Sequence, residues 1–273
     1  MFEKMKLRSF IFYLIIFFII FGITIGIISP ESDLTIDILA SIILFVLFPL
    51  FWFKKQMKKY DMHVKEVITW EGMTKKLPSL FLITLTVLLF SLAFFWVQTY
   101  LFSFIAPNFA ENQLLITVEM VKEYEQASSV QMFCIFISAC IIAPVAEEFI
   151  FRGYFLKRIA QKTNIIFSLI ITNLIFAILH MDYIGAFMFG FLLSLIYLKT
   201  NNLLYPIMIH FLNNTLVSLL DLFKIPIPDF INYTEIEQVA SFMLPNIIIG
   251  LISLPFLIYY LHKYRLNSQL KTE

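Results

Sequence analysis

The fold of this protein is decided by the stretch VQMFCIFISACIIAPVAEEFIFRGYFL, residues 130–156. A helix needs about 20 mostly apolar residues to cross a hydrocarbon core of about 30 Å, and this stretch exceeds that length. It nevertheless contains Glu147, Glu148 and Arg152. A charge inside a membrane costs from about 2.5 to well above 10 kcal/mol, depending on the reference state. We therefore expect a transmembrane helix whose charged residues face other helices and serve a function.

The whole chain has the composition of an integral membrane protein. Of its 273 residues, 60% are hydrophobic and only 14% are charged. Soluble domains average about 45–50% apolar and about 25% charged residues, so this apolar surplus cannot be buried in one water-soluble core. The formal net charge is only +1, and we expect no nucleic-acid partner.

Seven further apolar runs are consistent with membrane spans. The eight predicted spans are residues 10–28, 34–53, 77–106, 130–156, 165–180, 183–198, 203–220 and 241–261. The fifth and sixth are short and are joined only by Met181 and Asp182. The sequence thus predicts an all-α, polytopic transmembrane bundle of about eight spans, which forms a single membrane domain over residues 1–273.

The charged residues outside the spans are sorted by sign. Alternate connections are basic and carry Lys4, Lys6, Arg8, Lys54, Lys55, Lys58, Lys59, Lys65, Lys75, Lys76, Lys157, Arg158, Lys162, Lys199, Lys263, Arg265 and Lys271. The other connections carry Glu31, Asp33, Glu111, Glu119, Glu123, Glu125, Asp182, Asp229, Glu235 and Glu237, with only Lys122 and Lys224 as basic residues. Because basic loops stay in the cytoplasm, this pattern predicts a multi-pass cell-membrane protein with both termini cytoplasmic. The Lys-rich connection 54–76 is expected to lie against anionic lipid headgroups.

The charged residues of the fourth span have spacings that suit chemistry. Glu148 and Arg152 are one helical turn apart, in the acid-before-base order that favours an ion pair. Glu147 points about 100° away from Glu148 on a helix, so it is left without that partner. A carboxylate in this position could serve as a general base.

Two later spans carry polar residues of the kinds that bind an oxyanion or a metal. His180 ends the fifth span, and the seventh contains His210 and Asn214, four residues apart on one helix face. That face could stabilise an oxyanion, or Glu147, His180 and His210 could hold a divalent metal, with zinc the first choice. From the 1.5 Å rise per residue, Glu147 and His210 both lie roughly 15 Å from the nearest cytoplasmic basic residue. His180 lies roughly 27 Å from Lys162, unless its helix starts late or is tilted.

These elements together resemble the CPBP family, the CAAX proteases and bacteriocin-processing enzymes also called Abi intramembrane proteases. The family motifs are EExxxR, FxxxH, and Hxxx followed by Asn or Asp. They stand here as Glu147 to Arg152, Phe176 to His180, and His210 to Asn214, in the family order and on successive spans. The resemblance covers about residues 130–220, which we expect to be the catalytic core.

The resemblance implies hydrolysis of peptide bonds within the membrane. It assigns activation of water to Glu147 with His180, and oxyanion binding to His210 and Asn214. It also implies that Glu148 and Arg152 are needed. Bacterial members act in bacteriocin maturation, self-immunity, surface-protein display or peptide signalling, so the expected partners are a peptide or membrane-protein substrate and a sensor or bacteriocin-system protein.

Three alternatives remain open at this stage. The same residues could form a metalloprotease site, with Glu147, His180 and His210 as ligands. The chain could instead be a non-catalytic membrane scaffold or immunity protein that binds a peptide or a sensor kinase in the same buried pocket. A proton-coupled transporter is disfavoured, because no inverted repeat is present. The sequence leaves open the substrate, whether it is prenylated, and the membrane face from which it enters.

Overall fold

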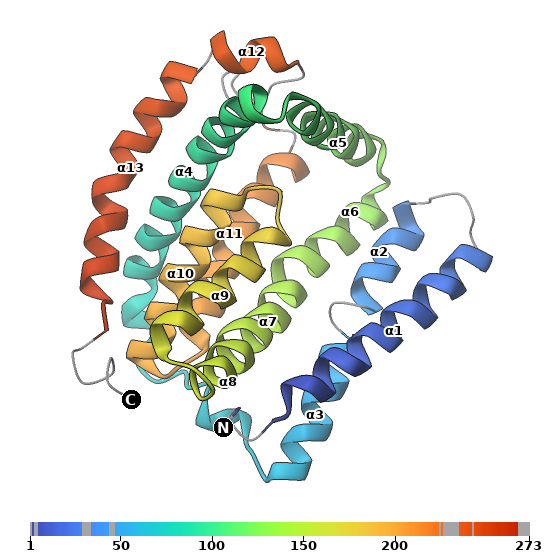
Figure 1. The fold of residues 1–273 in the computed structure, drawn as a ribbon, viewed down its shortest axis with the longest axis vertical. Coiled ribbons are helices and arrows are strands. Elements are labelled where there is room, and N and C mark those ends of the chain that lie inside the picture. The colour runs from blue at the N-terminus through green and yellow to red at the C-terminus, as the bar shows by residue number, and fades with distance from the viewer. Residues whose placement is uncertain are drawn as a thin grey trace.

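The computed structural model describes residues 5–28, 34–43, 47–223, 235–241 and 243–266, together with Phe2 and Ile225. Every regular element in these residues is helical, which confirms the predicted all-α class (Figure 1). Several charges used above to predict the orientation lie outside the described residues. They are Lys4, Glu31, Asp33, Lys224, Asp229 and Lys271.

Within the described residues, four helices are long and apolar enough to cross a membrane, fewer than the eight predicted spans. They cover Met73–Ile105, Ser129–Ala160, Tyr183–Thr200 and Met243–Lys263. Three shorter apolar helices, Arg8–Thr24, Ile165–Ile178 and Leu204–Leu220, coincide with the first, fifth and seventh predicted spans. The stretch predicted as the second span differs most, because it forms two helices, α2 (Leu34–Ile42) and α3 (Phe48–Tyr60). Helix α3 also continues past Phe53 through four lysines, which are good helix formers.

The long helix α4 (Met73–Ile105) organises the C-terminal half of the bundle. It contacts α10 (Tyr183–Thr200), α11 (Leu204–Leu222) and α13 (Met243–Lys263), and Figure 1 shows α13 running beside it. Threonine hydroxyls on α4 donate to carbonyl groups one turn earlier in the same helix, as Thr86 does to Leu82 and Thr99 to Phe95. Such bonds satisfy polar groups inside an apolar helix without a partner from another element.

Helix α5 (Pro107–Gln126) lies in a stretch that the sequence analysis treated as an acidic connection between spans, with no helix predicted. The helix begins with a proline, and the missing N–H group costs nothing there because the first N–H groups of a helix have no acceptor within it. Its inner face carries Ala110, Gln113 and Leu114, which are buried, and its glutamates are exposed. The helix was missed because a search for apolar runs finds only helices that span a membrane, and α5 is amphipathic.

The helix with the charged residues is continuous but irregular. It consists of α6 (Ser129–Phe136), η4 (Ile137–Ile142), α7 (Ala143–Glu148), η5 (Phe149–Leu156) and α8 (Lys157–Ala160), and both η4 and η5 are π-helical. Pro144 begins α7 directly after the first π-helical segment. π-helical turns are rare and occur frequently at functional sites. They flank the segment that holds Glu147 and Glu148.

A tight connection joins α9 (Ile165–Ile178) to α10. The sequence analysis placed His180 in the last turn of the fifth span, but α9 ends at Ile178. His180 therefore lies in the turn between the two helices. Helix α1 (Leu7–Ile28) and the short segments α12 (Ile236–Ser241) and η3 (Val64–Glu66) complete the described elements.

Candidate active site

Glu148 is the centre of a buried polar cluster between α7, η5 and α11. Its Oε1 accepts hydrogen bonds from Arg152 Nη1 and from His210 Nδ1, and both distances are 2.9 Å. The side chains of Glu148 and Arg152 are completely buried and that of His210 is 5% exposed. The predicted ion pair between Glu148 and Arg152 is thus present, and the same carboxylate fixes the orientation of the His210 ring.

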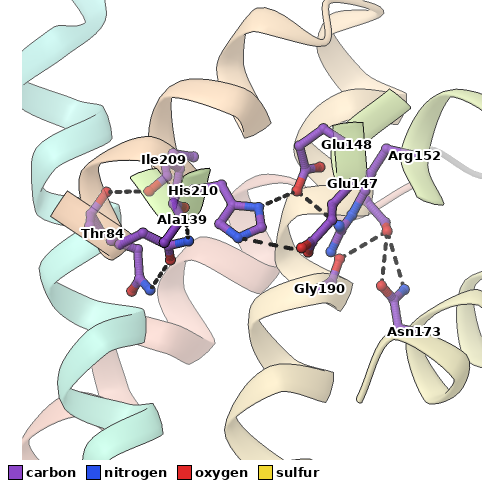
Figure 2. A network of polar contacts seen from close by, with 12 residues as sticks. Thr84, Ala139, Glu147, Glu148, Arg152, Asn173, Gly190, Ile209 and His210 are labelled. Atoms are coloured by element: carbon purple, nitrogen blue, oxygen red, sulfur yellow. Dashed lines mark hydrogen bonds and ion pairs between the residues drawn. The ribbon is translucent and has the colours of Figure 1, made fainter. Parts of the chain in front are cut away.

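Glu147 approaches the other nitrogen of the same imidazole. Figure 2 shows His210 between the two glutamates, with His210 Nε2 4.0 Å from Glu147 Oε2. That distance is too long for a hydrogen bond. Glu147 Oε2 is buried and has no hydrogen-bond partner among the described residues, although a quarter of the side chain is exposed. The near contact agrees with the predicted equal depth of Glu147 and His210.

The Arg152 guanidinium lies over the ring of Phe176 at 4.4 Å and beside Gly190. The aromatic face stabilises the buried cation, because its negative quadrupole attracts positive charge. A Cβ atom at Gly190 would lie 2.8 Å from Arg152 Nη2 and 2.6 Å from Asn173 Oδ1. Only a glycine leaves room here for both side chains. Asn173 is held in turn by the hydroxyl of Ser194.

His180 is oriented by its own turn and by α4. Its Nδ1 lies 2.7 Å from the carbonyl oxygen of Phe176. Since a carbonyl oxygen only accepts hydrogen bonds, Nδ1 carries the proton and Nε2 is left for chemistry. The His180 ring also packs on the Phe176 ring, with centroids 4.3 Å apart. Gln98 of α4 holds the turn from both sides, because it donates to the Met181 carbonyl and accepts from the Ile184 N–H.

Asp182 caps the N-terminus of α10 and joins the same turn to α4. Its Oδ1 accepts from the Gly185 N–H and its Oδ2 from the Ser91 hydroxyl. Burial raises the pKa of Asp182 to about 6, while these two hydrogen bonds act in the opposite direction. Gly185 is required here, since a Cβ atom would lie 1.8 Å from the Asp182 carboxylate.

A cavity of about 1050 Å³ lies against these residues. His180, His210 and Asn214 line it, as do Asn213, Asp182 and Phe176. Asn214 donates one N–H to the Ala139 carbonyl, and its Oδ1 accepts from Asn213, so its second amide hydrogen is left for a ligand. Glu147 is not among the residues that line the cavity. Its nearest link to the cavity is His210, which lines the cavity and whose Nε2 lies 4.0 Å from Glu147 Oε2.

Comparison with known proteins identifies the segment that contains this cluster. Residues 129–216 match the family described as "Type II CAAX prenyl endopeptidase Rce1-like". This segment is an Rce1-like domain. The domain includes Glu147, Glu148, Arg152, His180, His210 and Asn214.

A curated relative matches part of the chain. The chain is 33% identical over 89 residues to the Bacillus subtilis (strain 168) protein named "Putative membrane peptidase YdiL". The match covers 32% of this chain and 36% of that relative, so the chain spans about a third of the length of the relative that it matches. No solved structure matches the chain.

The Rce1-like domain brings the six predicted site residues together in two groups that share His210. Glu147, Glu148 and Arg152 form the buried cluster, whereas His180 and Asn214 line the cavity. Sequence reasoning missed Gly190 and the roles of Gln98 and Asp182. Two of these residues carried a signal in the sequence, since Gly190 lies within an apolar helix and Asp182 directly precedes one. The residues that they contact lie on other helices, so their roles could not be predicted.

The three residues predicted as metal ligands do not form a three-ligand group in this arrangement. The described residues contain no group of three or more His, Cys, Asp or Glu side chains that could hold a metal ion. His210 Nδ1 is bonded to Glu148, and only its Nε2 faces Glu147. A zinc ion would need ligand atoms at about 2.0–2.2 Å, so the side chains would have to move to bind it together.

Proposed function

We propose that this protein is an intramembrane endopeptidase, a hydrolase of the CAAX protease and bacteriocin-processing type. The observation that supports it best is the position of His210. This imidazole joins a buried Glu–Arg pair to a second glutamate, and it lines the same cavity as His180 and Asn214. The membership of this segment in the Rce1-like family supports the reaction class.

In the proposed reaction, Glu147 accepts a proton from a water molecule with the help of His180. The free oxygen of Glu147 supports this role, because a buried carboxylate oxygen without a partner is available to a bound water. His180 Nε2 is available in the same way, since its Nδ1 is bonded to Phe176. The activated water attacks the scissile carbonyl carbon, and the proton passes to the leaving amine.

His210 and Asn214 bind the oxyanion that develops on the carbonyl oxygen. Asn214 offers its second amide hydrogen. His210 donates from Nε2 when it is protonated. Fixed donors in a site of low dielectric stabilise such an oxyanion strongly, by about 2.7–4 kcal/mol per donor in a well-studied case.

Glu148 and Arg152 position the reacting groups without contacting the substrate. Glu148 holds the His210 ring through Nδ1, and Arg152 offsets the charge of Glu148. Removal of one partner of a buried ion pair typically costs about 3–5 kcal/mol, because the other charge is left uncompensated. Substitution of either residue should therefore reduce both stability and activity.

We also propose that the protein is a multi-pass protein of the cell membrane, with both termini in the cytoplasm and in contact with membrane lipids. Its partners would be a peptide or membrane-protein substrate and a sensor or bacteriocin-system protein. A metal-dependent variant of the mechanism, with zinc on Glu147, His180 and His210, makes a separate prediction. Stoichiometric zinc in the purified protein, together with loss of cleavage after chelation, would favour it over the metal-free reaction.

The decisive experiment compares peptide termini in membranes and medium from cells that carry wild-type protein, Glu147→Gln or Glu119→Gln. Glu119 is an exposed glutamate of α5 that does not line the cavity, so Glu119→Gln controls for the loss of one carboxylate. New termini with the wild type and the control, but not with Glu147→Gln, are expected. Identical termini in all three strains, under conditions where gene deletion has a phenotype, would favour the non-catalytic scaffold or immunity protein.

A further inference from the structure

The cavity lies at one end of the bundle. Its walls come from the last part of α4, from α5, from the first turns of α6 and α10, and from the C-terminal half of α11. Its floor is buried and includes Phe176, Ala186 and His210. Lining residues that are exposed lie in α5, at the start of α6 and at the C-terminal end of α11, among them Glu125, Ser129 and Leu222. The mouth of the cavity is therefore at the α5 end of the molecule.

Most of the described basic residues lie at the opposite end, and Lys122 of α5 is the exception at the mouth end. Ser91 lines the cavity roughly four turns after Lys76 on α4, and Met132 lines it roughly seven turns before Lys157 on the irregular helix. Figure 1 accordingly shows α5 and α8 at opposite ends of the bundle. Lys199, at the end of α10, donates a hydrogen bond to the Lys263 carbonyl at the end of α13.

The Lys-rich connection also belongs to this basic end. The Val67 carbonyl accepts a hydrogen bond from the Leu203 N–H, and Asn202 bonds to the Thr69 backbone. These contacts dock the connection between α3 and α4 onto the beginning of α11. By the positive-inside rule, the end that gathers lysine and arginine faces the cytoplasm. The mouth of the cavity then faces the extracytoplasmic side.

The charged groups of the cavity are acidic or imidazole groups. Among the described residues that line it, Glu125 and Asp182 are the carboxylates, and His180 and His210 are the side chains able to carry positive charge. No lysine or arginine belongs to the described lining. The volume of about 1050 Å³ is at the upper end of the range of about 300–1,000 Å³ for small-molecule pockets, which leaves room for several residues of an extended peptide. Carboxylates that line a cleft attract ligands of positive charge.

We infer that the site receives cationic peptide segments from the extracytoplasmic side of the membrane. The substrate class is an exported peptide, or an outer segment of a membrane protein, that carries lysine or arginine near the scissile bond. A prenylated cytoplasmic C-terminus would approach from the wrong side. This inference rests on the proposed function for its substrate, but the direction and charge of access can be measured without catalysis.

The test uses single cysteines in a full-length chain in which Cys134 and Cys140 are replaced by alanine. Met132→Cys places a thiol in the cavity wall, and Lys162→Cys places one at the exposed basic end. Intact cells are treated with a membrane-impermeant maleimide, before and after permeabilisation. Labelling of Met132→Cys in intact cells, with labelling of Lys162→Cys only after permeabilisation, is expected. Ser129→Cys at the mouth repeats the test if Met132→Cys does not fold.

The charge preference is measured on the same Met132→Cys protein with two small impermeant thiosulfonates, one cationic and one anionic. Their rates are normalised to their rates with a free thiol in solution. The cationic reagent should react several-fold faster, and the preference should fall when Glu125→Gln is added. Equal normalised rates would overturn the preference for cationic peptides.

Labelling of Met132→Cys only from the cytoplasmic side would overturn the inferred direction of access, as would failure of the cavity thiol to react from either side. The labelling is repeated in the Glu147→Gln variant, which removes the proposed base. Outward labelling of a protein that keeps Glu147 but cleaves nothing would refute the proposed function and leave the direction of access intact. Cleavage by a protein whose cavity is labelled only from the cytoplasm would refute the direction of access and leave the proposed function intact.

Discussion

Gly190 provides a quantitative test of the packing around Arg152. In Gly190→Ala, the new Cβ would lie 2.6 Å from Asn173 Oδ1, 2.8 Å from Arg152 Nη2 and 3.2 Å from the Phe176 ring. The side chains of Arg152 and Asn173 are fully buried and Phe176 is 1% exposed. Each is held by other contacts, so none can move aside freely. The added methyl group must displace the guanidinium, the amide, or both.

A matched control exists in Gly250 on α13. A Cβ atom there would lie 3.5 Å from Phe94 and 3.6 Å from Ala93, which is ordinary van der Waals contact. Both glycines lie inside helices, so the gain of about 0.5–1 kcal/mol from replacing a helical glycine by alanine is common to both variants. The difference between the two variants isolates the steric effect. Overpacking typically costs about 1–3 kcal/mol, and about 3–5 kcal/mol is expected if Arg152 is driven from Glu148.

The free energy of unfolding is measured by detergent titration in mixed micelles, followed by far-ultraviolet circular dichroism. We expect Gly190→Ala to be less stable than Gly250→Ala by about 1–3 kcal/mol, or more if the ion pair breaks. Asn173→Ala removes one of the two close atoms, so the penalty of Gly190→Ala should be smaller in that background. Equal stability of the two glycine variants, within about 0.5 kcal/mol, would refute the tight packing described here.

Two further predictions concern the turn that carries His180. Gln98→Ala leaves the Met181 carbonyl and the Ile184 N–H without their partner, so kcat for peptide cleavage should fall much more than KM changes. Thr99→Val, which removes only a bond within α4, is its control and should cleave normally. Asp182→Asn tests the raised pKa of Asp182. Because the folded state binds this proton more tightly than the unfolded state does, the carboxyl group makes stability fall as pH rises from 3.8 to about 6. The wild type minus Asp182→Asn difference in unfolding free energy should therefore decline across this interval, and a flat difference would contradict the assignment.

Most of the helices could be predicted from the sequence, because long apolar runs must form helices in a membrane, where backbone groups have no water to bond. The helices between residues 73 and 105, 129 and 160, 183 and 200, and 243 and 263 all begin and end within a few residues of a predicted span. The prediction of helices failed where the length of an apolar run does not show where a helix begins and ends. It missed α5, whose polar face hides its helical pattern, and it treated residues 34–53 as one span although two helices form there.

The sequence by itself determined which residues are candidates for the site, since a charge or imidazole inside an apolar run is costly and stands out. It also determined the pair between Glu148 and Arg152, because residues four apart on one helix must be neighbours. Only the tertiary structure decided that Glu148 also binds His210, that His180 sits in a turn held by Gln98, and that Gly190 makes room for the guanidinium. These contacts join residues on different helices. Their distances depend on how the helices pack, which the spacing within a single helix does not specify.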